Sequence, residues 1–231
     1  MLLSVIIVNL NNAKGLKKTL LSLNKLKLKL KFEALIIDGN SSDNSSEIFN
    51  SFDFKDNVTF ISENDSGIFN AMNKGIKLSK GEWVNFMNSG DCFFEVDNLD
   101  QILRTNHNNC IVYGDYIQDN IVRKTKNLDI IKTGIIHACH QSMFFNIGRY
   151  RGLIFYNEFF KIYSDYHLIA KLFVKKLDFI KVERVICDFE GGGISNRVSL
   201  RKRLEKYLSI TINFGLQGLI KSLIWRIKNI H

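Results

Sequence analysis

Proline is absent from this chain of 231 residues, and long apolar runs and grouped metal ligands are missing as well. The four cysteines are scattered and form no Cys-x-x-Cys pair, so we expect reduced thiols rather than a disulfide framework or a zinc site. No apolar run reaches the roughly 18 residues of a membrane-spanning helix. No basic leader precedes the first predicted strand, so no secretory signal is expected. The lack of proline excludes no class of function.

Two patterns of nucleotide-binding and nucleic-acid-binding proteins are also missing. Only Gly15 follows the first predicted strand, where a dinucleotide oxidoreductase carries a Gly-x-Gly-x-x-Gly turn. The basic residues are not interleaved with aromatics, as a stacking platform for nucleic acid would require. The net charge of +9 nevertheless suits phosphorylated substrates, anionic lipid or nucleic acid. A basic module that binds membrane or nucleic acid and a nucleotidyltransferase on a related sheet therefore stand as alternatives to the interpretation below.

Apolar runs alternate with helical periodicity in the first part of the chain. Buried strands are predicted at residues 3–8, 34–37, 58–61 and 83–87. Strands that alternate with helices favour a parallel sheet in an α/β fold. Further along, we expect strands at 110–113 and 116–123, whose closeness suits a hairpin, and at 142–146 and 179–188. Helices are expected at 96–103 and 163–175, and a basic amphipathic helix is expected over 197–230.

Polar side chains follow the predicted strands where ligands bind in open α/β sheets. Asn9, Asp38 and Asp65 come at or just after the ends of the first three strands, and Asp91 follows the fourth. The strand before Asp91 is too apolar to lie on the surface, so this acid is expected at a core edge. A carboxylate there favours a divalent cation, which takes oxygen ligands and bridges to phosphates.

Four spaced segments carry a family resemblance. They are Asp65-Ser66-Gly67-Ile68-Phe69-Asn70-Ala71-Met72-Asn73-Lys74-Gly75-Ile76, Gly81-Glu82-Trp83, Asn88-Ser89-Gly90-Asp91 and Ser164-Asp165-Tyr166. With these segments the chain resembles the family 2 glycosyltransferases of the GT-A fold. It is most similar to the bacterial branch that builds colanic-acid-type, capsular and O-antigen polysaccharides. The resemblance runs from Ser4 to about Asn196.

The resemblance implies a nucleotide-diphosphate-sugar donor at the carboxyl edge of the sheet. Asn9 would line the base pocket, Asp38 and Asp65 would contact the base or ribose, and Lys74 would neutralise phosphate. Each residue has an ordinary structural alternative. Asn9 is also a turn residue, Asp38 begins a segment that can equally form a turn and a helix cap, and Asp65 is also a charge favoured by a helix dipole. Lys74 is also a solvated helix lysine.

The resemblance also implies Mn²⁺ or Mg²⁺ at Asp91 and a general base at Asp165. The segment that ends at Asp91 departs from the family's Asp-x-Asp pattern, because Asn88 and Gly90 stand where acids are common. His140 would complete the metal shell or touch the diphosphate. The structural alternatives are helix caps for the two aspartates and a polar core residue for His140.

The expected organisation is a GT-A catalytic domain over residues 1–196, with a mostly parallel sheet flanked by helices, and a helical tail over 197–231. Residues 1–91 would bind the nucleotide sugar, and residues 92–196 the acceptor. The glycines at 191–193 would form a lid or a linker. The tail has a basic and an apolar face, which suits an anionic membrane surface. The alternative is that its apolar stripe packs on the domain.

Together these features predict a metal-dependent inverting glycosyltransferase. Its acceptor would be a saccharide, expected to be lipid-linked, in capsule, lipopolysaccharide or related surface polysaccharide biosynthesis. The expected location is cytoplasmic, peripheral at the inner face of the plasma membrane.

Overall fold

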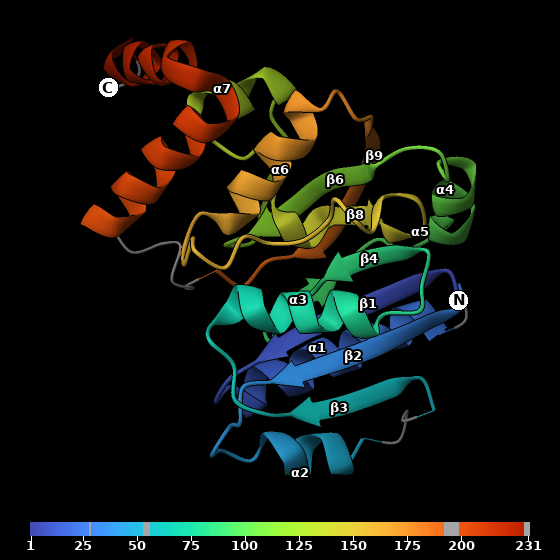
Figure 1. Cartoon of the computed structure of the whole chain (residues 1–231). Helices are drawn as coiled ribbons and strands as arrows, with labels where there is room; N and C mark the ends of the chain where they lie inside the picture. The colour runs from blue at the N-terminus through green and yellow to red at the C-terminus, as the bar shows by residue number, and fades with distance from the viewer. Residues whose placement is uncertain (28, 53–55, 192–198, 229–231) are drawn as a thin grey trace.

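The computed structural model describes residues 1–27, 29–52, 56–191 and 199–228. In these residues nine strands form one mixed sheet, with helices on both faces (Figure 1). The order of its main path is β3-β2-β1-β4-β8-β6-β9-β5, and β7 pairs with β6. Figure 1 shows β3 and α2 at one end of the molecule and α7 at the other.

The first four strands are parallel, as the sequence predicts. They are β1 (Leu3–Asn9), β2 (Phe32–Asp38), β3 (Val58–Ser62) and β4 (Trp83–Phe86). The register pairs Asn9 with Asp38 and Asp38 with Ser62. This alignment brings polar residues from three strands to one edge of the sheet.

The other half of the sheet is mixed. It contains β5 (Cys92–Phe93), β6 (Ile111–Gln118), β7 (Ile121–Arg123), β8 (Met143–Asn146) and β9 (Phe179–Asp188). β8 runs antiparallel to β4 and β6, and β9 runs parallel to β6. The expected hairpin exists, but its turn is at Asp119 and Asn120, not at residues 114–115. Both turn residues have positive φ, which asparagine and aspartate tolerate better than most residues.

Helices cover the two faces of the sheet. They are α1 (Ala13–Lys27), α2 (Ser45–Asn50), α3 (Ile68–Leu78), α4 (Leu99–Thr105), α5 (Ile147–Tyr150) and α6 (Ser164–Val174), with 3₁₀ turns η1 (Leu128–Thr133) and η2 (His140–Ser142). Side chains alternate along β1, so Ile6 packs with α3 while Val5 and Ile7 pack with α1. Burial of each such side chain contributes roughly 1.5–3 kcal/mol.

The C-terminal helix α7 (Leu200–Lys228) is interrupted at Gly215, whose φ of 65° and ψ of −168° are not helical. Its buried residues include Glu205, Ser209 and the core residue Ile210. Ser222 also anchors it, because its hydroxyl donates to the Thr133 carbonyl at 2.8 Å. The helix therefore packs on α6 and η1 through a face that combines small and polar residues with the apolar Ile210.

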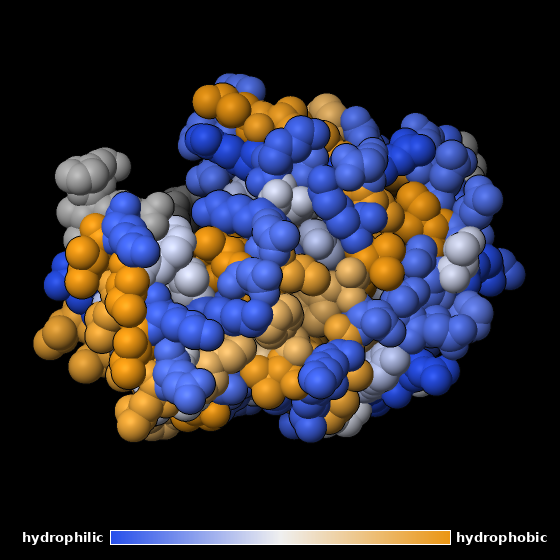
Figure 2. All heavy atoms as spheres, turned by 90° about the horizontal axis from the view of Figure 1, so that it is seen from above, coloured by the Kyte–Doolittle hydropathy of each residue, from blue (hydrophilic) through white to orange (hydrophobic). Residues whose placement is uncertain are grey.

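The predicted apolar stripe of α7 lies mainly on the outside. Its exposed members are Leu204, Leu208, Ile212, Leu216, Leu223 and Ile227, which are 42–71% exposed. Figure 2, viewed from above, shows apolar side chains along the left edge of the molecule, over α7. The alternative that this stripe packs on the domain is therefore wrong, although Leu219 is partly buried against the core.

Two sequence expectations fall on residues outside the described ranges. Gly192 and Gly193 of the glycine loop lie there, and so does the boundary between Asn196 and Arg197. The division into a domain and a tail stays a prediction. Across the described parts of the chain, no helix has both the length and the apolar character needed to span a membrane.

Candidate functional site

The first group of candidate residues lies where β1 and β2 end side by side. Asn9 and Asp38 are each 1% exposed, and Asn9 Nδ2 donates to Asp38 Oδ1 at 2.7 Å. Ser41 donates to both carboxylate oxygens, through its N–H (2.9 Å) and its hydroxyl (2.6 Å). Ser62 Oγ donates to Oδ2 at 2.7 Å. Burial alone would raise the pKa of Asp38, but these hydrogen bonds outweigh it and lower the pKa.

This network turns the Asp38 carboxylate toward the protein. Both of its oxygens accept from protein donors, so the carboxylate holds the loop that leads to Ser41 across the end of the sheet. Asn9 is held in the same network, and its Nδ2 also donates to Ser45 Oγ at 2.9 Å. The structure thus brings Asn9 and Asp38 together, and their contact with a nucleotide stays a prediction.

Asp65 and Lys74 lie near the polar corner formed by Asn9, Asp38 and Ser41 at the ends of β1 and β2, but they make different contacts. A side chain at Gly39 would collide with the Asp65 carboxylate, so the glycine allows a close approach. Asp65 Oδ1 accepts from the N–H two residues ahead (2.8 Å), at the start of α3. Lys74 Nζ lies 2.8 Å from Glu63 Oε1 and donates to the Asn64 carbonyl at 2.8 Å. Asp65 therefore joins the corner, whereas the charge of Lys74 is paired, and both assigned roles stay predictions.

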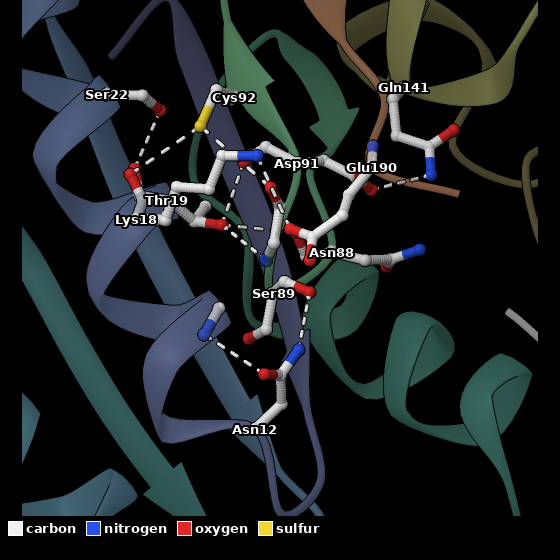
Figure 3. Close-up of polar contacts among 12 residues, drawn as sticks. Asn12, Lys18, Thr19, Ser22, Asn88, Ser89, Asp91, Cys92, Gln141 and Glu190 are labelled. Atoms are coloured by element: carbon white, nitrogen blue, oxygen red, sulfur yellow. Dashed lines mark hydrogen bonds and ion pairs between the residues drawn. The ribbon is translucent and has the colours of Figure 1, made fainter. Parts of the chain in front are cut away.

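The loop after β4 is pinned to α1 (Figure 3). Thr19 Oγ1 donates to the Asp91 carbonyl (2.8 Å) and accepts from the Gly90 N–H (2.9 Å). Asn12 Nδ2 donates to the Ser89 carbonyl at 3.0 Å. Gly90 has a φ of 111°, a backbone conformation that residues other than glycine rarely adopt. This backbone conformation explains why a glycine stands where an acid is common.

Asp91 is almost fully enclosed, with 4% of the residue exposed. Gln141 Nε2 donates to its Oδ2 at 2.8 Å, and the Glu190 N–H donates to its Oδ1 at 3.0 Å. Three segments, the ends of β4 and β9 and the turn η2, therefore meet at one carboxylate. Burial raises the pKa of Asp91 to about 6 despite these two hydrogen bonds.

The turn η2 connects Asp91 with the predicted base. Gln141 contacts Asp91, and the preceding residue, His140, places Nδ1 3.9 Å from Asp165 Oδ2. That distance is too long for a hydrogen bond. Burial lowers the pKa of His140 to about 4, so its imidazole is neutral at physiological pH. The structure brings together Asp91, His140 and Asp165, which are far apart in the sequence.

Asp165 lies deep among protein atoms, yet 24% of its side chain remains exposed. Burial raises the pKa of Asp165 to about 6. The Tyr156 hydroxyl is buried and has no hydrogen-bond partner within the described residues. Burial, and then the charge of Asp165, raise the pKa of this hydroxyl. A partly open carboxylate that titrates near neutrality has the properties of a general base.

A supporting residue that the sequence analysis missed is Glu205 on α7. It is 5% exposed, and its carboxylate accepts from the N–H groups of Lys161, Ile162 and Tyr163 at 2.8–3.0 Å. Arg201 Nε donates to it at 2.8 Å. Burial would raise the pKa of Glu205, but these hydrogen bonds outweigh it and lower the pKa. The one available signal was that Glu205 is the only acid in a basic segment.

Asn73 on α3 positions a second part of the site. Its Oδ1 accepts from the Tyr156 N–H (2.9 Å), and its Nδ2 donates to the Tyr156 carbonyl (3.0 Å). The same Nδ2 donates to Glu158 Oε1 at 2.8 Å. Because Asn73 is 5% exposed, it fixes the segment that carries Tyr156 rather than contacting a ligand.

The residues around Asp91 fit a divalent cation. Asn88 Oδ1, Ser89 Oγ and His140 Nε2 are buried and have no hydrogen-bond partner within the described ranges. Oxygen atoms and a neutral imidazole suit Mg²⁺ or Mn²⁺, which bind through one or two carboxylates plus phosphates and water. No cluster of three or more His, Cys, Asp or Glu that could hold a metal occurs in the part of the chain described. Phosphate or water oxygens would therefore complete the coordination.

Solved structures with the same fold include two glycosyltransferases. Staphylococcus aureus TarS in complex with UDP matches all of this chain and 73% of its own, with a TM-score of 0.76 at 18% identity. The mannosyltransferase PcManGT from Pyrobaculum calidifontis, in complex with GDP-Man and Mn²⁺, covers 99% of this chain, and the match covers 76% of its own, with a TM-score of 0.64 at 12% identity. These likenesses confirm the expected GT-A fold, and the mixed second half of the sheet belongs to it.

Curated relatives and a family model agree with the fold. A PGL/p-HBAD biosynthesis glycosyltransferase of Mycobacterium bovis is 27% identical over 205 residues, which cover 82% of this chain and 77% of the relative. The poly(ribitol-phosphate) β-N-acetylglucosaminyltransferase TarP of Staphylococcus aureus is 27% identical over 243 residues, covering 96% of this chain and 73% of TarP. Residues 4–161 match the model of glycosyl transferase family 2. Because this match covers more than half of the chain, the chain belongs to glycosyl transferase family 2.

Proposed function

We propose that this glycosyltransferase moves a sugar from a nucleotide-diphosphate sugar to a saccharide acceptor, with inversion at the anomeric carbon. The single observation that carries the proposal is the joining of Asp91 and Asp165 through one turn, His140–Gln141. One carboxylate is enclosed beside buried oxygen atoms that have no hydrogen-bond partner among the described residues, and the other is partly open. The enclosed environment suits a carboxylate that binds a cation beside the donor diphosphate. The partly open environment suits a carboxylate that takes the proton of the acceptor hydroxyl.

The donor would lie along the carboxyl ends of β1, β2 and β4. Asn9 and Asp38 would hold the loop that receives the base and ribose, with Asp65 beside it. Asp91, Asn88 and His140 would hold Mn²⁺ or Mg²⁺. When bound, such a cation stabilises negative charge on the departing diphosphate as a Lewis acid. In support, PcManGT was solved with GDP-Man and Mn²⁺.

Asp165 would act on the acceptor. An acceptor hydroxyl must lose its proton as its oxygen attacks the anomeric carbon, and a carboxylate within hydrogen-bond reach can take that proton. With a pKa of about 6, Asp165 is mostly ionised at neutral pH and retains useful basicity. The sugar–phosphate bond breaks as the new glycosidic bond forms, so a single displacement inverts the configuration.

The acceptor would be lipid-linked, in bacterial surface polysaccharide biosynthesis, and the enzyme would be held at the anionic inner face of the plasma membrane. Exposed apolar residues of α7 alternate with basic ones, and Arg203, Lys221 and Lys228 are exposed. An apolar face between cations suits an interfacial helix, and each basic residue near an anionic surface contributes about 1 kcal/mol. This arrangement would bring a membrane-borne acceptor close to α6.

The first experiment identifies the donor. Purified protein is screened for thermal stabilisation by UDP, GDP, dTDP and CDP with Mn²⁺, and nucleotide release is then measured with the matching sugar nucleotides. We expect one nucleotide to stabilise the protein and its sugar conjugate to release that nucleotide. Stabilisation by none of them, together with no release from any donor, would contradict the proposal.

The second experiment tests the membrane. Removal of α7 would also remove Glu205 and the core residue Ile210, so point variants are the better test. The double variant Ile212→Ser/Leu216→Ser should co-sediment less with anionic vesicles at low salt than the wild type. Ile121→Ser, at an exposed apolar position on β7, is the matched control and should bind like the wild type. Equal binding by all three proteins would rule out the α7 surface.

A further inference from the structure

A basic hollow lies between the two halves of α7 and the start of α6. It has a volume of about 240 Å³ and is lined by Tyr163, Ser199, Lys202, Arg203, Lys206 and Arg226. The break at Gly215 lets the second half of α7 fold back, so that Arg226 reaches residues of the first half. Arg226 Nη1 donates to the Tyr207 hydroxyl at 3.0 Å, which confirms this approach.

Cations dominate the lining, and none of its residues within the described ranges is an acid. The nearest acid on the same turn, Glu205, directs its carboxylate to the backbone before α6 and to Arg201. In the described part of the protein, no carboxylate lies within ion-pair distance of Arg203, Lys206 or Arg226. Like charges held close together cost free energy, and an anion in the hollow would offset that cost.

Lys206 is held against the fold by its aliphatic stem. Its aliphatic stem lies over Gly134, where any side chain would collide with it, and Gly134 has a φ of 82° that favours glycine. Burial, and then the charges of Arg226 and Lys202, lower the pKa of Lys206. A partly desolvated ammonium group that faces other cations is a strong attractor for a multiply charged anion.

The hollow adjoins the predicted base. Tyr163 lines the hollow and lies two residues before Asp165, and the negative charge of Asp165 helps to raise the pKa of Tyr163 to about 12, after burial. The positive charge of Lys202 in turn acts on Asp165. An anion held here is therefore a neighbour of the group that would receive the acceptor's proton. The donor diphosphate has a separate proposed place at Asp91.

We infer that this hollow binds a phosphate group of the acceptor, a monoester, diphosphate or phosphodiester attached to the saccharide. The inference rests on the proposed glycosyl transfer and adds the chemical class of its acceptor. Four cations that converge on a small hollow match the charge and the oxygen atoms of such a group. Anchoring the phosphate would position a hydroxyl of the same acceptor at Asp165, which lowers the entropic cost of the reaction.

The test uses inorganic pyrophosphate as the probe, in metal-free buffer, with calorimetry on the full chain. The nucleoside diphosphate identified by the donor screen is added at a concentration first shown to saturate the protein in this metal-free buffer, so that the donor site is filled. We expect pyrophosphate to bind under this condition, and Lys206→Gln/Arg226→Gln to bind it at least about tenfold more weakly. Lys221→Gln, an exposed lysine on the same helix that does not line the hollow, is the matched control. Melting temperatures check that each variant is folded.

Equal binding by all variants, or complete displacement of pyrophosphate by the nucleotide, would overturn the inference. A further arm adds anionic phosphatidylglycerol vesicles, and loss of pyrophosphate binding would assign the hollow to lipid headgroups instead of the acceptor. Nucleotide release by the wild type is measured in parallel. If release fails while pyrophosphate binds at the hollow, the proposed function is wrong and the anion site remains.

Discussion

Replacement of Asp91 by asparagine tests whether a buried charge is kept for a cation. Asp91 is 4% exposed, and burial raises its pKa from 3.8 to about 6. A raised pKa means that the folded protein holds the proton more tightly than the unfolded chain. The wild type therefore loses stability as the pH rises from about 4 through about 6, whereas asparagine stays neutral throughout.

The size of the effect follows from the two pKa values. Between pH 5 and pH 7.5, the free energy of unfolding of the wild type should fall by roughly 1.5 kcal/mol relative to Asp91→Asn. Asparagine has one acceptor oxygen for the two donors, Gln141 Nε2 and the Glu190 N–H. The lost hydrogen bond costs about 1 kcal/mol at both pH values. The buried charge is therefore diagnosed by how the difference in unfolding free energy between the two proteins changes from about pH 5 to about pH 7.5.

The assay is urea unfolding of both proteins at pH 5.0 and pH 7.5 in chelator, with Asp119→Asn in the exposed hairpin turn as control. At pH 7.5 the measurement is repeated with Mn²⁺ and the nucleoside diphosphate, which should stabilise the wild type and not Asp91→Asn. Sugar transfer by Asp91→Asn should be nearly abolished. A stability difference that does not change with pH would refute the buried charge. Near-wild-type activity of Asp91→Asn in chelator-treated buffer with added Mg²⁺ would refute the metal role.

Three further predictions concern α6 and its support. Asp165→Asn should lower turnover by roughly 10²–10⁴-fold and leave donor affinity almost unchanged; collapse of nucleotide binding with turnover intact would place Asp165 in the donor site. Turnover of the wild type should fall as the pH drops through about 6, because the Asp165 carboxylate becomes protonated; a profile that stays flat from pH 7.5 to pH 5 would contradict its role as base. Glu205→Gln should lower the free energy of unfolding by about 1–3 kcal/mol, because one amide oxygen replaces a carboxylate that accepts three backbone N–H groups. If Glu205 positions Asp165, its variant should also lose turnover more than donor affinity, whereas a stability loss alone would make Glu205 merely structural.

Local pattern was enough to predict the first half of the fold. The apolar runs before Asn9, Asp38 and Asp91 are buried parallel strands in the structure, because a strand covered on both faces needs apolar residues throughout. The polar residues that end these strands meet at one edge for the same reason. The sequence also indicated the family, since its motifs lie within short contiguous segments.

The mixed half of the sheet was harder to predict, because strand order and direction depend on pairing between distant segments. The position of the hairpin turn at Asp119 and Asn120 was missed, since no glycine or proline marks it. The hydrogen bond between Gln141 and Asp91 spans 50 residues and leaves no local pattern. Periodicity also left open which face of α7 is buried, because a helix with apolar residues on more than one side can pack in several ways.

The sequence by itself determined the parallel strands, their polar ends and the membership in glycosyl transferase family 2, because these depend on neighbouring residues. Only the tertiary structure decided what surrounds each candidate side chain. It turned Asp38 inward, enclosed Asp91, left Asp165 partly open and buried Glu205 under the start of α6. Burial and hydrogen bonding set the charge and reach of a carboxylate, and both depend on segments that only the folded chain brings together.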